Sequence, residues 1–142
     1  NIYAIGIGMA FGFKMADSQI AAFFTIATGE FNQLLKYFAI TEENMLKAAA
    51  IGDLLLTSHS LKSRNMSFGY QLAQGSSKEA ILKQRNSVTE GVATCLVLVE
   101  KLLDNQPKLP FLTFIYQAIA TASPLTKDAL LAVINQSQAG LS

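Results

Sequence analysis

Apolar residues recur at three- and four-residue spacing along nearly the whole chain, and no segment alternates strictly between apolar and polar residues. The first pattern lines one face of a helix, whereas a half-buried strand requires the second. In the segment 109–119 the apolar residues also cover the other sides of the helix. The sequence therefore predicts an all-α fold in which this helix is central to the core.

Capping residues and glycines predict where the helices begin and end. Ser63 precedes a helix from Arg64 to about Gln74, and Gly75 follows it as a terminator. Asp53, taken alone, is typical of an N-cap before three leucines. The other predicted caps are Asp17 or Ser18 before a helix over 19–38, Thr41, Ser76 with Glu79, and Ser123 or Thr126. Because no repeat, low-complexity tract or linker divides the 142 residues, we expect a single helical domain.

The chain is more apolar than a typical soluble domain, with 51% hydrophobic residues, 15% charged residues and a mean hydropathy of +0.32. A membrane-spanning helix needs roughly 20 mostly apolar residues, but Lys14, Asp17 and Glu30 interrupt the longest apolar runs. We therefore expect no membrane span. The apolar excess instead indicates a surface that another domain or a second subunit covers, and it is compatible with a homodimer.

The charge and the single cysteine and histidine argue against several classes of function. A net charge of +1 and a pI near 8.0 provide no broad basic surface for nucleic acid. Cys95 lies among apolar residues, which predicts a core side chain and not a nucleophile. His59 has no partners at metal-ligand spacing, so we expect an exposed loop residue and no metal site.

Three glycines near the start, Gly6, Gly8 and Gly12, raise the question of a dinucleotide-binding loop. Their spacing departs from G-x-G-x-x-G, and no strand or βαβ pattern surrounds them in this chain. Because glycine has no side chain, they predict either a helix that packs closely on a neighbour or a backbone that approaches a ligand.

A polar segment over residues 52–65, G-D-L-L-L-T-S-H-S-L-K-S-R-N, interrupts the apolar pattern. The cap at Ser63 places Arg64 and Asn65 in the first turn of a helix, where free N–H groups and the positive end of the dipole attract an anion. Arginine adds a planar fork that matches phosphate oxygens, and asparagine adds another donor. The pattern favours a phosphate site, and a solvated helix start is the alternative.

Several motifs occur in a fixed order: N-I-Y-A-I-G-I-G at the start, G-D-L-L-L-T, S-x-x-S-R-N, F-G at 68–69 and V-T-E-G at 88–91. Together they resemble the C-terminal helical domain of bacterial-type NAD(P)-dependent glycerol-3-phosphate dehydrogenase, and the resemblance covers residues 1–142. It implies an all-α domain like the C-terminal domain of 6-phosphogluconate dehydrogenase-type enzymes, beside an N-terminal Rossmann domain that this chain lacks. It also implies a cytoplasmic enzyme that reduces dihydroxyacetone phosphate to sn-glycerol 3-phosphate with NADH or NADPH, in carbohydrate metabolism and phospholipid synthesis.

The resemblance also assigns roles to individual residues. The substrate-binding residues that it implies are Asn1, Asp53, Thr57, Ser63, Arg64 and Asn65, and the cofactor-binding residues are Arg64, Val88 and Glu90. Ser63, Arg64 and Asn65 would hold the substrate phosphate, and Asp53 would help to orient the catalytic lysine. In the family that lysine stands immediately before the residue equivalent to Asn1. We therefore expect this chain by itself, without that lysine and without the cofactor domain, to be inactive.

The chain departs from the family pattern at four positions where basic residues are usual, namely Ile20, Ile26, Met66 and Ser67. Their loss indicates either weakened cofactor or substrate contacts or a divergent lineage of the family. Two other hypotheses stay open. One is a non-enzymatic helical interaction or dimerisation module, and the other is the helical domain of a sister dehydrogenase such as ketopantoate reductase. The S-R-N match argues against the second, because a phosphate site has little use for a substrate without phosphate.

Overall fold

The computed structural model describes residues 1–41, 48–84, 89–102, 107–121 and 124–139. These residues form helices and no strand, which confirms the all-α prediction. The helices are α1 (Ile2–Gly12), α2 (Asp17–Tyr37), α4 (Ala48–Ser58), α5 (Arg64–Ala73), α6 (Lys78–Lys83), α7 (Glu90–Lys101), α8 (Pro110–Ala120) and α9 (Lys127–Ala139). Within these ranges no helix combines the length and the apolar content that crossing a membrane requires.

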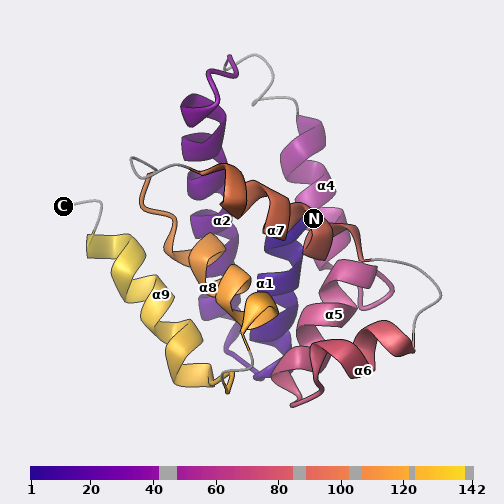
Figure 1. Cartoon of the computed structure of the whole chain (residues 1–142). Helices are drawn as coiled ribbons and strands as arrows, with labels where there is room; N and C mark the ends of the chain where they lie inside the picture. Colours follow the sequence, from indigo (N-terminus) through magenta and orange to yellow (C-terminus); the bar gives the residue numbers. More distant parts are fainter. Residues whose placement is uncertain (42–47, 85–88, 103–106, 122–123, 140–142) are drawn as a thin grey trace.

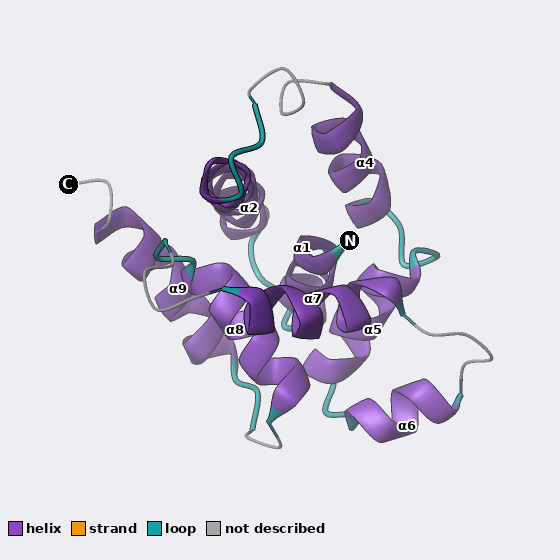
Figure 2. Ribbon diagram, turned by 45° about the horizontal axis from the view of Figure 1, so that its top comes forward, coloured by secondary structure: helices purple, strands orange, loops and turns teal. Residues whose placement is uncertain are grey.

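Helix α1 occupies the middle of the fold, with α2, α4, α5, α7 and α8 packed around it (Figures 1 and 2). All of its residues except Phe11 are buried. A helix that is apolar on every side loses contact with water only when other helices surround it. The segment predicted to be central, now α8, does bury Phe111, Leu112 and Ile115 in the core, but it packs against one side of α1.

The closest helix contact joins α1 to α5, and glycines on both helices allow it. A Cβ atom on Gly8 would overlap the carbonyl oxygen of Met66, and one on Gly69 would overlap the carbonyl oxygen of Ile5. Gly12 faces Tyr70 in the same way. The early glycines therefore serve close helix packing, the first of their two predicted roles.

Several predicted helix ends are confirmed. The Ser63 hydroxyl accepts the Met66 backbone N–H at 3.4 Å and caps α5. Gly75, with a φ of +90°, follows the end of this helix in the left-handed conformation that favours glycine. Of the two residues considered for the last helix, Thr126 accepts the Ala129 N–H at 3.2 Å. The alternative at 123 and the helix predicted after Thr41 lie outside the described residues.

Three predicted caps are wrong. Ser77 and not Ser76 caps α6, because the Ser77 hydroxyl accepts the Ala80 N–H at 3.1 Å. Asp17 is not a cap but the first residue of α2, and Ala16 occupies the N-cap position. The backbone N–H of Ala16 donates to the side-chain oxygen of Gln19 at 3.0 Å. Asp53 lies in the middle of α4, since three alanines with high helix propensity already begin the helix at 48–50.

Glu30, which the sequence suggested only as a break in an apolar run, is buried, and its carboxylate accepts three hydrogen bonds. It accepts the backbone N–H groups of Phe111 at 2.6 Å and Leu112 at 2.9 Å, and the Tyr3 hydroxyl at 3.0 Å. Because Phe111 and Leu112 lie in the first turn of α8, the carboxylate of α2 satisfies the free N–H groups of that helix. The bonds tie α1, α2 and α8 together.

Cys95 is fully buried in α7, which confirms the prediction of a core side chain. Burial raises the pKa of its thiol to about 12. Because the thiolate is the reactive form, we expect a disulfide reagent at pH 8 to label Cys95 only as fast as the protein unfolds. Labelling kinetics, followed with and without urea, test this. Rapid labelling of the native protein would contradict it.

Candidate functional site

A polar cavity of about 480 Å³ lies where the starts of α1, α5 and α7 meet the end of α4. In Figure 2 the N-terminus marks this place, between α4 and α7. The residues that line the cavity are Asn1, Leu56, Thr57, Ser63, Arg64, Asn65 and Glu90. Of these seven described residues, six were predicted as site residues, although they come from four segments of the sequence.

The start of α5 contributes two side chains with different environments. Arg64 is the first residue of the helix and its side chain is exposed, whereas the Asn65 side chain is only 7% exposed. The first-turn N–H groups of this helix are the positive end of its dipole. An anion in the cavity would therefore meet a guanidinium, an amide and the partial positive charge of α5 together.

Two hydrogen bonds join this helix and α1 to the start of α7. The Asn65 Oδ1 accepts the backbone N–H of Gly91 at 3.0 Å. The Asn1 Nδ2 donates to the Glu90 Oε2 at 3.4 Å. These bonds hold the ends of three helices around the cavity. Gly91, which the V-T-E-G motif contains, is a residue of the site that sequence reasoning did not single out.

Helix α4 presents Thr57 to the cavity and Asp53 one turn earlier on the same face. Asp53 is exposed and does not line the cavity itself. Its charge nevertheless reaches the other side of the site. Burial lowers the pKa of the Asn1 amino group, while the negative charges of Asp53 and Glu90 act to raise it. The charges of both carboxylates therefore act at the backbone nitrogen of Asn1.

The remaining predicted positions are not among the described residues that line the cavity. Val88 lies outside the described residues. Of the positions where the family usually carries basic residues, Ile20 and Met66 are buried in the core, and Ser67 accepts the Gln71 side-chain amide at 3.1 Å. Leu56, which was not predicted, lines the cavity and is 78% exposed.

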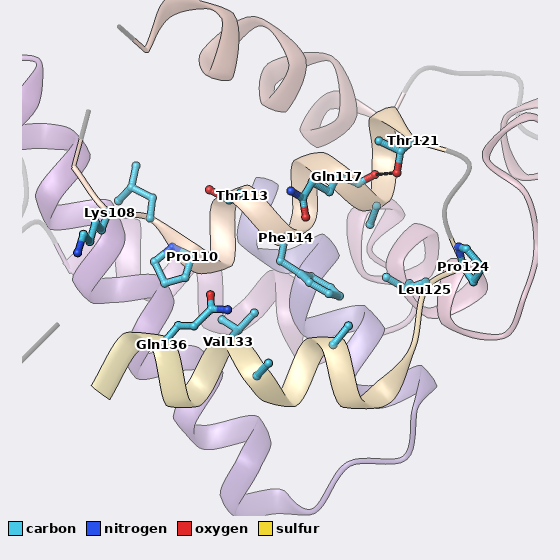
Figure 3. Close-up of a pocket in the computed structure, with 14 residues that line it drawn as sticks. Lys108, Pro110, Thr113, Phe114, Gln117, Thr121, Pro124, Leu125, Val133 and Gln136 are labelled. Atoms are coloured by element: carbon cyan, nitrogen blue, oxygen red, sulfur yellow. Dashed lines mark hydrogen bonds between the residues drawn. The ribbon is translucent and has the colours of Figure 1, made fainter. Parts of the chain in front are cut away.

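A larger groove of about 770 Å³ runs between α8 and α9. Phe114 of α8 and Val133 of α9 line it together with mainly apolar or neutral polar residues, as Figure 3 shows. Of the described residues that line the groove, Lys108 alone is charged. Its described lining combines this lysine with two glutamine amides and has no acidic group, whereas the smaller cavity brings Arg64 and Glu90 together with two asparagine amides. Nor do the described residues include a group of three or more histidine, cysteine or acidic side chains that could hold a metal ion.

Residues 1–128 match the family described as the C-terminus of NAD-dependent glycerol-3-phosphate dehydrogenase. The chain belongs to this family. Among curated members, the glycerol-3-phosphate dehydrogenase [NAD(P)+] of Parvibaculum lavamentivorans is 32% identical over 136 residues, which is 96% of this chain and 40% of that protein. The Hyphomonas neptunium enzyme of the same name is 40% identical over 98 residues, which is 69% of this chain and 29% of that protein. The chain thus spans less than half of the length of these family members.

A solved member of the family has the same fold. The crystal structure of glycerol-3-phosphate dehydrogenase from Coxiella burnetii superposes with a TM-score of 0.78 at 23% sequence identity. The match covers 95% of this chain and 40% of the Coxiella chain. The helical arrangement around α1 is therefore the family fold, as the resemblance implied.

Proposed function

We propose that this chain is the substrate-binding half of a cytoplasmic NAD(P)-dependent glycerol-3-phosphate dehydrogenase, which reduces dihydroxyacetone phosphate to sn-glycerol 3-phosphate for phospholipid synthesis. The observation that carries the proposal is the convergence of Asn1, Thr57 and Arg64 from separate helices on one polar cavity. Family membership over residues 1–128 supports it. A Rossmann domain would form the other wall of the cleft.

The substrate phosphate would bind at the start of α5. The Arg64 guanidinium offers paired donors, and the Asn65 amide and the first-turn N–H groups add neutral donors. The Ser63 hydroxyl already accepts the Met66 N–H, so its own proton can donate to a phosphate oxygen. A phosphate dianion accepts hydrogen bonds only, and this set of donors suits it.

The carbonyl end of the substrate would lie toward Asn1. In the family the catalytic lysine stands immediately before this position, where the negative charges of Asp53 and Glu90 act. Attraction to two carboxylates would keep the lysine protonated and oriented. The lysine would then give its proton to the substrate oxygen as the carbonyl carbon is reduced.

The cofactor, NAD or NADP, would supply the hydride and be held mainly by the Rossmann domain. From this chain, Arg64 offers donors and Glu90 offers acceptors at the cavity edge, which suits the amide and hydroxyl groups of a nicotinamide nucleotide. Val88 would complete this contact.

The exposed apolar residues beside the cavity would be covered in the whole enzyme. Leu56 lines the cavity and is 78% exposed, and Leu61, two positions before Ser63 in the sequence, is 52% exposed. Burial of such side chains against the Rossmann domain would stabilise the closed arrangement of the two domains. A second subunit could cover other exposed apolar residues of this chain in a homodimer.

Replacing Arg64 with alanine in the full-length protein is expected to raise the KM for dihydroxyacetone phosphate. Hydrogen bonds to a charged group contribute about 1.5–3 kcal/mol, which corresponds to a roughly 10- to 150-fold change. Steady-state oxidation of NADH measures the change.

Two comparisons complete this experiment. Lys62→Ala removes an exposed positive charge two residues away that does not line the cavity, and its KM should stay within about twofold of the parent because surface charges contribute little. Unchanged kinetics of Arg64→Ala would instead favour a non-enzymatic interaction module. Turnover of ketopantoate in preference to dihydroxyacetone phosphate would assign the chain to a sister dehydrogenase.

A further inference from the structure

Helix α7 holds the side-chain amide of Asn65 in one orientation. Its Oδ1 accepts the Gly91 N–H at 3.0 Å, and the residue is only 7% exposed. Turning the amide over would bring its NH₂ group against the Gly91 N–H. Two donors would then face each other in a buried position, so this orientation is excluded.

Glycine at position 91 is what allows this contact. A Cβ atom there would lie 2.6 Å from the Asn65 Oδ1 and 2.9 Å from the Asn1 carbonyl oxygen. Both distances are shorter than carbon and oxygen atoms tolerate without moving apart. The absence of a side chain at Gly91 therefore lets α7 approach Asn1 and Asn65 this closely.

We infer that Gly91 is a positioning residue for the anion site, and that it acts by leaving only the donor end of the Asn65 amide for the ligand. The inference rests on the proposed function, because it assumes that a phosphate binds in the cavity that Asn65 lines. An asparagine free to rotate could present oxygen or nitrogen. With its oxygen bound to α7, Asn65 offers the phosphate hydrogen-bond donors and rejects ligands that need an acceptor at this point.

Asn65→Asp is the informative variant. Its carboxylate can accept the Gly91 N–H as the amide does, so the melting temperature should change by no more than about 2 °C. The second oxygen, however, replaces the NH₂ group with a negative charge beside the phosphate. We expect the KM for the phosphorylated substrate and the inhibition constant of inorganic phosphate each to rise roughly 100-fold in the full-length protein, with a smaller change in the KM for NADH.

Gly91→Ala tests the positioning role directly. We expect it to raise the same two constants roughly 10-fold while changing kcat by less than threefold, because the Asn65 amide is displaced and not removed. Gly29→Ala is the matched control, since a Cβ there meets nothing within 4 Å and Gly29 is far from the cavity in the sequence. Its KM for the phosphorylated substrate and its inhibition constant for inorganic phosphate should equal those of the parent protein.

The outcomes separate this inference from the proposed function. Should Arg64→Ala weaken phosphate binding while Asn65→Asp leaves both constants unchanged, the inference is overturned and the proposed function stands. Should neither variant change them, both are overturned. A loss of phosphate affinity in Asn65→Asp at an unchanged melting temperature supports the inference, even if Gly91→Ala proves too unstable to purify.

Discussion

Replacing Gly69 with alanine is expected to destabilise the protein by about 3 kcal/mol, at the upper end of the usual cost of overpacking. The added Cβ would overlap the carbonyl oxygen of Ile5 in α1. A backbone carbonyl inside a buried helix cannot move away by changing rotamer, so the whole of α5 must shift. Urea denaturation followed by circular dichroism measures the change in the free energy of unfolding.

The control for this prediction is Gly29→Ala in the exposed part of α2. Its Cβ would meet nothing within 4 Å, so the higher helix propensity of alanine should stabilise the protein by about 0.5–1 kcal/mol. Equal effects of the two substitutions would refute the packing argument. Because Asn1 caps α1 and Arg64 begins α5, the proposed function also predicts that Gly69→Ala raises the KM for dihydroxyacetone phosphate in the full-length protein.

The second large effect is expected at Glu30. Glu30→Ala would leave the N–H groups of Phe111 and Leu112 and the Tyr3 hydroxyl without their shared acceptor. Each unsatisfied buried donor costs about 1–3 kcal/mol, and we expect a total loss of about 4 kcal/mol. Glu30→Gln keeps the size of the side chain and one oxygen, but its NH₂ group faces a donor. The expected loss is therefore about half as large, and denaturation of both variants measures it.

The stability contributed by Glu30 should also depend on pH. Burial raises the pKa of the carboxyl group, although the hydrogen bonds from Phe111, Leu112 and Tyr3 act in the opposite direction. The folded protein then holds the proton more tightly than the unfolded chain does. The contribution is therefore complete below the unfolded pKa, near 4.5, and decreases as the pH rises through the higher folded value.

Glu30→Gln is the reference for this dependence because its side chain does not titrate. We expect the difference in unfolding free energy between the parent protein and Glu30→Gln to be larger near pH 4.5 than near pH 7.5. Denaturation at the two pH values tests the sign. A difference that grows as the pH rises would mean that the three hydrogen bonds outweigh burial.

The sequence by itself determined the helical class and the cap at Ser63, which places Arg64 in the first turn of a helix. These features depend on residues within about four positions of each other, because helix hydrogen bonds and caps are local. The order of motifs likewise identified the family and six of the residues that line the cavity. Local patterns were less reliable for Asp53 and Ser76, where neighbouring residues offered more than one start for a helix.

Only the tertiary structure decided which distant groups meet. Glu30 accepts from Phe111 across 81 positions, and Asn65 accepts from Gly91 across 26. It also decided that α1, and not α8, is the central helix, and that Asp53 acts on the cavity by its charge from outside the lining. Periodicity tells which face of a helix is apolar but not which helix covers it. That choice depends on the packing of all the helices at once, where the absence of a side chain at Gly69 or Gly91 sets how closely two backbones approach.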